Sequence, residues 1–513
     1  MKMSWRRLPI DSTDCWSLFA GLLLALSFPR PDLASVAWFG LLPLFVVMER
    51  RPFRSGFLAG VGFFGLVLYW LNIVMTTYGR LHPLLSVVAY LLLVAYLALF
   101  FGVSTWAACR CRQRLGLSLA LTLPVFWVAL EFLRSFLLSG FPWAILGYSQ
   151  QSHLQLIQSA DLFGPYGLSF LLILSNATLA ALWLARGKGF LRAFPRFAVM
   201  ATVLLFAANL GYGTLRLAEQ LDEREQNLTT VLAQGCLDQS VKWDPAYQQR
   251  TIDIYRQLSS PAASDPAPEL IIWPESAMPF YFQEGGPLAS AVTEVPQSSG
   301  AYLLFGTPAF EVINRRARNL NSAFLLGPDG GVLGRSDKVH LVPFGEYVPL
   351  GRFLPFIDKL VVGIGDFVPG TISPLPMNGH HLGVLVCFEG IFPELARDYV
   401  RRGSDLLVNI TNDAWFGRSS APYQHLAMCR FRAVENRVWL ARAANTGISA
   451  LIAPSGRITA QSPFFERLAL SGSVGLGARP SFYTHYGDLL PAVLLVLAGW
   501  WLWRARRPVR SVA

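Results

Sequence analysis

The sequence predicts a polytopic α-helical membrane domain of about eight transmembrane helices, joined to one extracytoplasmic α/β domain. Composition is the first reason, because 53% of the 513 residues are hydrophobic and only 15% are charged, which is too apolar for an ordinary soluble enzyme. The second reason is where the apolar residues lie. Long apolar runs occupy residues 1–214 and 488–513, whereas residues 215–487 have the polar composition and short strand patterns of a folded domain. We therefore expect a seven-span N-terminal domain, a central α/β domain, and a C-terminal span with a basic tail.

Eight apolar runs approach the roughly 20 residues that a helix needs to cross a bilayer. They lie at about 15–28, 33–48, 56–77, 83–107, 115–138, 163–185, 194–214 and 488–503. Phe28-Pro29-Arg30-Pro31 separates the first two runs, which form either a tilted pair or a re-entrant hairpin. A cleaved signal peptide is the alternative for the first run. We favour an uncleaved anchor, because no small-x-small cleavage site follows cleanly.

Basic residues gather in alternate connections and predict the orientation. They cluster at both chain ends and near residues 50, 112 and 190, whereas the short loops between have few. Cytoplasmic loops are enriched in Lys and Arg. Both termini are therefore predicted to be cytoplasmic, and residues 215–487 to be periplasmic. The net charge of +11 then reflects topology, which argues against nucleic-acid binding.

The cysteines give no clear metal site. Cys236, Cys387 and Cys429 in the α/β domain lack metal-ligand spacing, and three cysteines in an oxidising compartment leave at least one unpaired. Cys109 and Cys111 fall in a predicted cytoplasmic loop. They are either metal ligands or, as we favour, a chance pair.

Three segments of the α/β domain place reactive side chains just after an apolar strand or a turn. The strand 381–386 leads into Cys387, the strand 269–273 leads towards Glu275, and Lys338 follows a turn. Side chains at strand ends are accessible to substrates. A thiol needs a base to become nucleophilic, and a carbonyl under attack needs a positive or N–H-rich site for its oxyanion. Cys387, Glu275 and Lys338 supply these three roles. The competing interpretation is that Cys387 is a small buried hydrophobic residue.

The order Glu275, Lys338, Cys387 in these contexts resembles the nitrilase, or carbon-nitrogen hydrolase, superfamily. The similarity continues through residues 407–417 and 432–437 to Asn445-Thr446-Gly447. It implies an αββα sandwich with a core of about residues 228–470, and a Glu-Lys-Cys triad whose cysteine forms a thioester. It implies no metal and no organic cofactor, and we find no phosphate-cradling glycine loop or metal constellation in the sequence.

A nitrilase-like domain between a seventh and an eighth span resembles the apolipoprotein N-acyltransferases, bacterial inner-membrane enzymes that complete lipoprotein maturation. Features of the membrane half that fit are Glu131 with Arg134, Phe141-Pro142-Trp143, the turn 164–167, and residues 483–488. The Glu131 and Arg134 pair can be structural, which we favour, or can contact substrate. The resemblance covers nearly the whole chain and is looser in the first two spans.

This resemblance implies a two-step transfer between lipids. Cys387 takes a fatty acyl chain from a membrane phospholipid as a thioester, then passes it to the α-amino group of diacylglyceryl-cysteine on an apolipoprotein. Glu275 is the general base, and Lys338 stabilises the oxyanion together with the backbone N–H of Phe388. The partners are then the phospholipid, the diacylglyceryl-apolipoprotein and the bilayer, and we expect a monomer.

Five further residues have supporting or substrate-binding roles. We expect Glu346 to orient Lys338 or the incoming amine, and Glu389 to hold the loop by hydrogen bonds. Trp243 is expected to shape the cavity, Phe388 to pack, and Trp415 to support the site. The alternative is that Lys338 and Glu346 lie on the surface of a hairpin, and that Trp243 is a core or surface residue.

Residues 353–368 are apolar but broken by glycines, Pro355 and two aspartates. We interpret Phe353, Leu354, Phe356, Ile357, Leu360 and Val361 as a mobile lid that dips into lipid, with a buried loop as the alternative. Three other function classes compete with acyl transfer. A membrane-anchored amidase or nitrilase would hydrolyse a small amide with the same triad, while a transporter or a purely structural protein would not need it.

Overall fold

The structure, a computed structural model, describes residues 10–186, 193–219, 226–239, 242–260, 267–313, 315–347 and 367–506. The chain divides into two compact units. A helical unit comprises Met1–Asn72, His82–Leu215 and Asp488–Ala513, and a sheet unit comprises Ile73–Leu81 and Arg216–Gly487. The predicted lid residues 353–361 lie outside the described residues.

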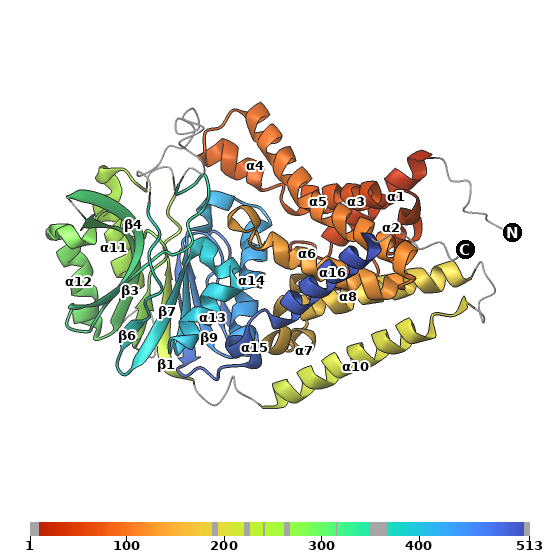
Figure 1. Cartoon of the computed structure of the whole chain (residues 1–513). Coiled ribbons are helices and arrows are strands. Elements are labelled where there is room, and N and C mark those ends of the chain that lie inside the picture. The colour runs from red at the N-terminus through yellow and green to blue at the C-terminus, as the bar shows by residue number, and fades with distance from the viewer. Residues whose placement is uncertain are drawn as a thin grey trace. The chain divides into compact units, whose positions relative to one another are not determined.

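The helical unit is built from helices and short helical turns (Figure 1). The longer helices are α1 (Ile10–Ala25), α3 (Pro52–Val67), α5 (Pro83–Leu115), α6 (Leu119–Arg134), α8 (Ala160–Ala185), α10 (Arg196–Ala218, whose last turn passes into the sheet unit) and α16 (Leu489–Arg506). The short ones are η2 (Ala34–Trp38), α2 (Leu42–Val47), η3 (Met48–Arg50), α4 (Leu71–Ile73), η5 (Leu137–Ser139), η6 (Leu146–Gln150) and α7 (Leu154–Ile157).

Four helices among the described residues are long and apolar enough to cross a membrane: α5, α8, α10 and α16. A fifth candidate is α3 followed by Leu71–Tyr78, a pair bent by 57°. The other predicted runs form shorter helices, since α1 and α6 have 16 residues each and the run 33–48 is split into η2 and α2. The helical domain is thus present, and the number of eight spans stays a prediction.

Local signals explain the limits of α5. Pro83 occupies its first turn, where no amide donor is needed, and the His82 side chain accepts from the Leu84 N–H. The helix ends at Gly116, whose φ of 71° is left-handed and suits glycine. Because α5 continues to Leu115, Cys109 and Cys111 are buried helical residues. Their prediction as loop residues is wrong, because the helix extends beyond the apolar run 83–107.

Glu131 and Arg134 both hold backbone groups in the loop after α6. One Glu131 carboxylate oxygen accepts from the Leu146 N–H at 2.9 Å, at the start of η6. The Arg134 guanidinium donates to the carbonyls of Phe141 at 3.1 Å and Trp143 at 2.7 Å. Both side chains are buried, so their charges fix the loop 141–146 within the helical unit.

The sheet unit contains two six-stranded sheets (Figure 1). The first has the order β12-β1-β2-β3-β4-β5, and the second has the order β11-β10-β9-β8-β7-β6. The strands of the first sheet are β1 (Gln226–Gln234), β2 (Leu270–Ile272), β3 (Tyr302–Ile313), β4 (Arg316–Leu326), β5 (Val332–Asp337) and β12 (Leu468–Gly475). Those of the second are β6 (Leu375–Met377), β7 (His380–Val386), β8 (Leu406–Thr411), β9 (Trp439–Ala444), β10 (Ala450–Ile452) and β11 (Ile458–Gln461).

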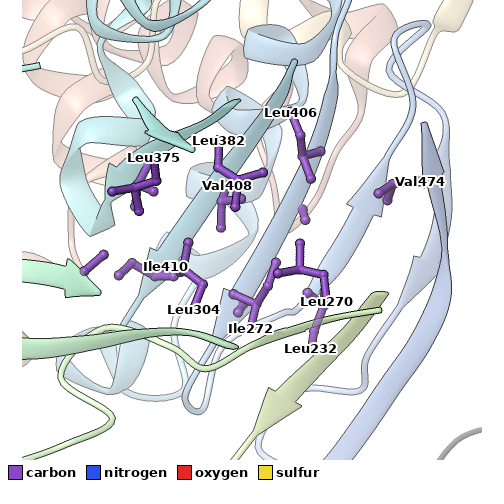
Figure 2. Packing of buried hydrophobic residues seen from close by; sticks show 14 of the residues in the cluster. Leu232, Leu270, Ile272, Leu304, Leu375, Leu382, Leu406, Val408, Ile410 and Val474 are labelled. Carbon is purple, nitrogen blue, oxygen red and sulfur yellow. The ribbon is translucent and has the colours of Figure 1, made fainter. Parts of the chain in front are cut away.

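The two sheets pack face to face through one apolar layer (Figure 2). Leu232, Leu270 and Leu304 from the first sheet meet residues such as Leu406 and Ile410 from the second. Each such side chain contributes about 1.5–3 kcal/mol when fully buried. β7 and β8 are buried along most of their length because both of their faces are covered, which explains their continuous apolar sequence.

Helices cover the outer faces and complete the αββα sandwich. A second apolar cluster joins α11 (Gln248–Leu258) and α12 (Pro287–Ser299) to the first sheet. On the second sheet, α13 (Pro393–Arg401) contacts β7 and α14 (Ala421–Asn436) contacts β9. The remaining helical elements are η4 (Val74–Tyr78), η7 (Pro245–Tyr247), η9 (Phe282–Glu284), η10 (Cys387–Ile391), η11 (Asp413–Phe416) and α15 (Phe482–Tyr486). The expected sandwich is confirmed.

Parallel pairing brings several strand ends to common edges. In the first sheet β2 runs parallel to β1 and β3, and in the second β8 runs parallel to β7 and β9. Val386 pairs with Ile410, so Cys387 and Thr411 follow at the same edge. Side chains that leave parallel strands at one edge lie close together, which is where α/β folds assemble sites.

Candidate active site

Cys387 sits on a sharp turn directly after β7. Its φ of 53° lies in the left-handed region, which costs a residue with a Cβ about 1–3 kcal/mol. Two donors hold its carbonyl oxygen: Asn409 Nδ2 at 3.3 Å and His425 Nε2 at 3.1 Å. The turn also needs Gly390, because a Cβ there would lie 2.7 Å from the Cys429 sulfur. The surrounding structure therefore fixes the direction of the thiol.

The Glu389 carboxylate ties this turn to the segment after Lys338. One of its oxygens accepts from the backbone N–H of Val386 at 2.7 Å. The other accepts from Val339 at 2.6 Å and His340 at 2.9 Å. Burial raises the pKa of Glu389 to about 7, against the opposing effect of these hydrogen bonds. Its position is one of loop support rather than of direct contact with the sulfur.

Glu275, Lys338, Glu346 and Asn321 form a compact charged cluster. The Lys338 Nζ lies 2.9 Å from Glu346 Oε1 and 3.6 Å from Glu275 Oε1. Asn321 Nδ2 donates to the same two oxygens, at 2.8 Å and 2.9 Å. The Asn412 N–H donates to the other oxygen of Glu275 at 3.0 Å. One ammonium and one amide thus hold two carboxylates together.

The charges of this cluster set the protonation of the lysine and the cysteine. Burial alone would lower the pKa of Lys338, but the carboxylates of Glu346 and Glu275 raise it above its ordinary value. Burial and the charge of Glu275 raise the pKa of the Cys387 thiol, and Lys338 opposes this only in part. The resting site therefore holds a neutral thiol beside a charged lysine, and a base must remove the thiol proton.

A second buried lysine, Lys242, reaches the same base. Its Nζ donates to the backbone carbonyl of Glu275 at 3.1 Å, and its side chain is 1% exposed. Burial lowers the pKa of Lys242 to about 8, although Glu275 and Cys387 act in the opposite direction. Its neighbour Trp243 is half-buried. A lysine at neutral pH is then close to its titration point.

A buried polar network lies behind the cysteine. Asp413 accepts from Arg442 Nη2 at 2.6 Å and from Thr411 Oγ1 at 2.9 Å, and Thr411 Oγ1 lies 3.3 Å from Cys387 Sγ. Arg442 Nη2 also lies 3.2 Å from His425 Nδ1. Gly447 leaves room for this network, since a Cβ there would lie 2.3 Å from Asp413 Oδ2.

Aromatic side chains surround the turn and the neighbouring loops. His340 stacks on Phe392 with ring centroids 3.8 Å apart, and Phe388 meets Phe392 edge-on at 5.3 Å. Burial and the charge of Lys338 lower the pKa of His340 to about 4, so the ring is neutral and packs as an aromatic. Trp415 is 37% exposed, and its ring centroid lies 5.5 Å from that of Tyr78.

Comparison with known proteins decides the family. Residues 20–178 match the model of the apolipoprotein N-acyltransferase N-terminal domain, and residues 231–475 match that of carbon-nitrogen hydrolases. The apolipoprotein N-acyltransferase of Geobacter metallireducens is 47% identical, over 95% of this chain and 95% of its own. This chain belongs to the apolipoprotein N-acyltransferase family.

Other similar proteins include a second member of the N-acyltransferase family and one amidase. The apolipoprotein N-acyltransferase of Pseudomonas putida is 34% identical over 95% of this chain and 97% of its own. A crystal structure of an amidase from Nesterenkonia is 22% identical, with a TM-score of 0.38, and covers 52% of this chain and 95% of its own.

The structure of this N-acyltransferase family member brings together several residues that the sequence predicted for the site and adds others that it did not. The structure joins Glu275, Lys338 and Glu346 in direct contact and places Cys387 within their electrostatic influence. The ring of Trp415 contacts the ring of Tyr78. The missed residues are Lys242, Asn321, Thr411, His425 and Arg442. Thr411 and Asp413 belong to the segment 407–417 that carries part of the resemblance. Its polar residues, which interrupt an apolar strand pattern, were the sequence signal that could have indicated them.

Proposed function

We propose that this chain transfers a fatty acyl chain from a membrane phospholipid, through a thioester on Cys387, to the α-amino group of diacylglyceryl-cysteine on apolipoproteins. The observation that carries the proposal is the buried thiol of Cys387 beside Glu275 and Lys338, in a chain whose N-acyltransferase relatives match it over 95% of its length. That coverage includes the helical unit, so it favours acyl transfer between lipids over hydrolysis of a small amide.

The first half-reaction forms the thioester. Glu275 takes the thiol proton, and the thiolate attacks the ester carbonyl of the phospholipid. The charged Lys338 stabilises the oxyanion, with the backbone N–H of Phe388 as the second donor. Collapse of the tetrahedral intermediate breaks the ester C–O bond. The leaving lysophospholipid oxygen takes the proton from Glu275, which restores the carboxylate.

The second half-reaction transfers the acyl chain to nitrogen. The α-amino group of diacylglyceryl-cysteine, in its neutral form, attacks the thioester carbonyl, and Glu275 accepts the proton that the nitrogen loses. The C–S bond breaks, and the sulfur recovers a proton from Glu275. The products are an N-acylated lipoprotein and the free thiol, so one carboxylate handles the proton in both steps.

Glu346 and Asn321 keep the base and the cation in place. Glu346 contacts Lys338, and Asn321 donates to both Glu275 and Glu346. We assign Glu346 to orienting Lys338, because the two groups lie 2.9 Å apart. Trp243 is assigned to shaping the cavity, Phe388 to packing, and Trp415 to support of the site.

The membrane arrangement is part of the proposal. We place the chain in the bacterial inner membrane as a monomer, with eight spans, both termini in the cytoplasm and residues 215–487 in the periplasm. Residues 1–214 and 488–513 form the membrane part. The support comes from the basic residues of alternate connections and from the four apolar helices of sufficient length. A fluorescent protein fused after Ala513 should fold and fluoresce, and an alkaline phosphatase fused there should be inactive.

Intact-protein mass spectrometry tests the reaction directly. The purified full-length enzyme is incubated with phospholipid alone, beside the Cys387→Ala variant. We expect a fatty-acyl mass gain on the wild type only, which a diacylglyceryl-cysteine peptide removes as it becomes N-acylated. A folded wild-type enzyme that gains no acyl mass contradicts the proposal, and ammonia release from small amides then tests the amidase alternative.

A further inference from the structure

The hydroxyl group of Thr411 lies between the Cys387 sulfur and a buried carboxylate. Thr411 is the last residue of β8, and its Oγ1 lies 3.3 Å from Cys387 Sγ and 2.9 Å from Asp413 Oδ1. A threonine hydroxyl has one proton to donate and lone pairs that accept. Thr411 therefore serves only one of these two neighbours as a donor at a time.

The tautomer of His425 determines which neighbour accepts the hydrogen bond of the Thr411 hydroxyl in the resting enzyme. His425 Nε2 faces the carbonyl oxygen of Cys387 at 3.1 Å, so this nitrogen must carry a proton. Burial and the charge of Arg442 lower the pKa of His425, so the ring is neutral and Nδ1 is an acceptor. Nδ1 accepts from Arg442 Nη2 at 3.2 Å. It has no proton to give to Asp413 Oδ1, which lies 3.3 Å away.

Asp413 is charged and accepts the hydrogen bond that the Thr411 hydroxyl donates. Burial would raise its pKa, but Arg442 and the hydrogen bonds lower it to about 2. Its Oδ2 accepts from Arg442 at 2.6 Å, which leaves Oδ1 for Thr411. A hydrogen bond to a charged acceptor is stronger than one to a neutral sulfur. In the resting enzyme the hydroxyl lone pairs therefore face the Cys387 thiol as acceptors.

We propose that Thr411 is a positioning residue that supports Cys387 in both of its charge states. While Cys387 is a thiol, Thr411 accepts from the S–H group and donates to Asp413. When Glu275 removes the thiol proton, the hydroxyl hydrogen rotates about the Cβ–Oγ1 bond and the hydroxyl donates to the thiolate. The thiol proton goes to Glu275 and Thr411 keeps its own proton, so no proton passes through Thr411. Asp413 retains its bond to Arg442 throughout.

Several charged groups act on the Cys387 sulfur. Thr411 adds an uncharged hydroxyl group, which can change from hydrogen-bond acceptor to donor. Glu275, Lys338 and Asp413 influence the Cys387 thiol from the ends of other strands. Lys242 and Arg442 also interact with Cys387 electrostatically. These charges are fixed for a given protonation state. Only the hydroxyl changes from acceptor to donor without a change of charge.

The alkylation rate of Cys387 as a function of pH tests this inference. The full-length enzyme in detergent is treated with iodoacetamide between pH 6 and pH 10, and the modified peptide that contains Cys387 is quantified by mass spectrometry. Site resolution is needed because five other cysteines are also free. Thr411→Val keeps the shape and loses the hydroxyl. Thr411→Ser keeps the hydroxyl and loses the methyl group, so the two variants form a matched pair.

We expect Thr411→Val to lower the alkylation rate about tenfold at each pH, because the thiolate, a charged acceptor, loses the hydrogen bond that Thr411 donates. Thr411→Ser should follow the wild type within about twofold. The inference is overturned if Thr411→Val matches the wild type, or if Thr411→Ser falls as far as Thr411→Val, since the hydroxyl would then not be the cause. If Thr411→Val fails to fold in a thermal unfolding scan, the comparison of Thr411→Ala with Thr411→Ser isolates the hydroxyl instead.

This inference rests on the proposed function only in taking Cys387 as the nucleophile and Glu275 as its base. Alkylation needs no lipid, so the two ideas fail separately. If phospholipid leaves no acyl group on Cys387 but the difference between the valine and serine variants persists, acyl transfer is wrong and the role of Thr411 stands. If the acyl adduct forms but the difference is absent, only the role of Thr411 is wrong.

Discussion

Replacing Lys338 by methionine removes the cation that the two buried carboxylates share. The Lys338 side chain is 1% exposed, and its Nζ lies 2.9 Å from Glu346 and 3.6 Å from Glu275. Methionine has a similar length and no charge. Removing one partner of a buried ionic group typically costs about 3–5 kcal/mol, because the remaining charge is left uncompensated. Glu275 and Glu346 would then keep Asn321 as their common donor, without the charge that offsets their mutual repulsion.

Two consequences of this substitution act on the acylation rate. The oxyanion loses a charged donor, which costs about 10²–10³ in rate by comparison with other oxyanion sites. The repulsion between the two carboxylates also disturbs the position of Glu275, the base. We therefore expect acyl-adduct formation on Cys387 from phospholipid to slow at least about 100-fold at pH 7. Mass spectrometry of samples quenched at successive times measures this rate.

Lys242→Met is the matched control for this prediction. Lys242 is equally buried and also contacts Glu275, but through the backbone carbonyl rather than the carboxylate. Loss of that hydrogen bond should cost about tenfold, which corresponds to about 1.5 kcal/mol, the lower end of what one charged hydrogen bond contributes. An acylation rate for Lys338→Met within tenfold of the wild type, or a larger loss for Lys242→Met than for Lys338→Met, would refute the assignment of Lys338 to the oxyanion.

Three further predictions follow from the same contacts. Glu275→Gln should form no acyl adduct above the Cys387→Ala background in the same assay, because an amide cannot accept the thiol proton; adduct formation at the wild-type rate would remove Glu275 from the mechanism. Asp413 has a pKa lowered to about 2, below its unfolded value, so its stabilisation should be complete above about pH 4 and be lost as the pH falls towards 2. Asp413→Asn should flatten this acid dependence of chemical unfolding, and an unchanged pH profile would contradict the coupling with Arg442. Glu389→Gln places an amide N–H against a backbone N–H donor, so it should lower the unfolding free energy by about 1–3 kcal/mol; denaturant titration should show a lower midpoint, and an unchanged midpoint would argue against loop support.

The sequence predicts the triad because each of its members stands at the end of a recognisable segment. Cys387 follows the apolar strand β7, Glu275 follows β2, and Lys338 follows β5. Strand ends can be recognised from hydrophobic patterning. The three strands are not neighbours, since β2 and β5 belong to the first sheet and β7 belongs to the second. That their ends meet was therefore implied by the resemblance and not by strand pairing. The αββα sandwich follows from the resemblance in the same way, since it depends on the order of elements rather than on individual contacts.

The supporting residues could not be predicted, because their partners lie far away in the sequence. Asn321 lies within β4 and contacts Glu275 across 46 positions, and Arg442 lies within β9 and contacts Asp413 across 29. A single polar residue in a strand pattern predicts a position that faces solvent. Whether that position is buried depends on the pairing register, which tertiary structure determines. Lys242 was missed for a similar reason, because a lysine in a loop ordinarily lies at the surface.

The helical unit shows the opposite balance between pattern and structure. Apolar runs locate helices well, but hydropathy does not say where a helix ends. α5 continues past its predicted limit until Gly116 caps it, and the run 115–138 gives a 16-residue helix with Pro124 inside. Helix limits depend on caps and prolines, whereas membrane crossing depends on apolar length. The end of a helix and the end of its apolar run need not coincide. Cys109 and Cys111 lie between the end of the apolar run 83–107 and the end of α5.

The hydrogen bonds around Cys387 also determine how losses of activity should be interpreted. Its left-handed conformation is held from three elements at once, by Asn409 in β8, His425 in α14 and Glu389 in η10. Substituting any of these residues can lower acyl transfer by moving the sulfur, without any contact between the residue and substrate. Alkylation separates the two causes, because it needs the sulfur in place and develops no oxyanion. A residue that positions the turn should affect alkylation and acylation about equally, whereas loss of Lys338 should slow acylation far more than alkylation.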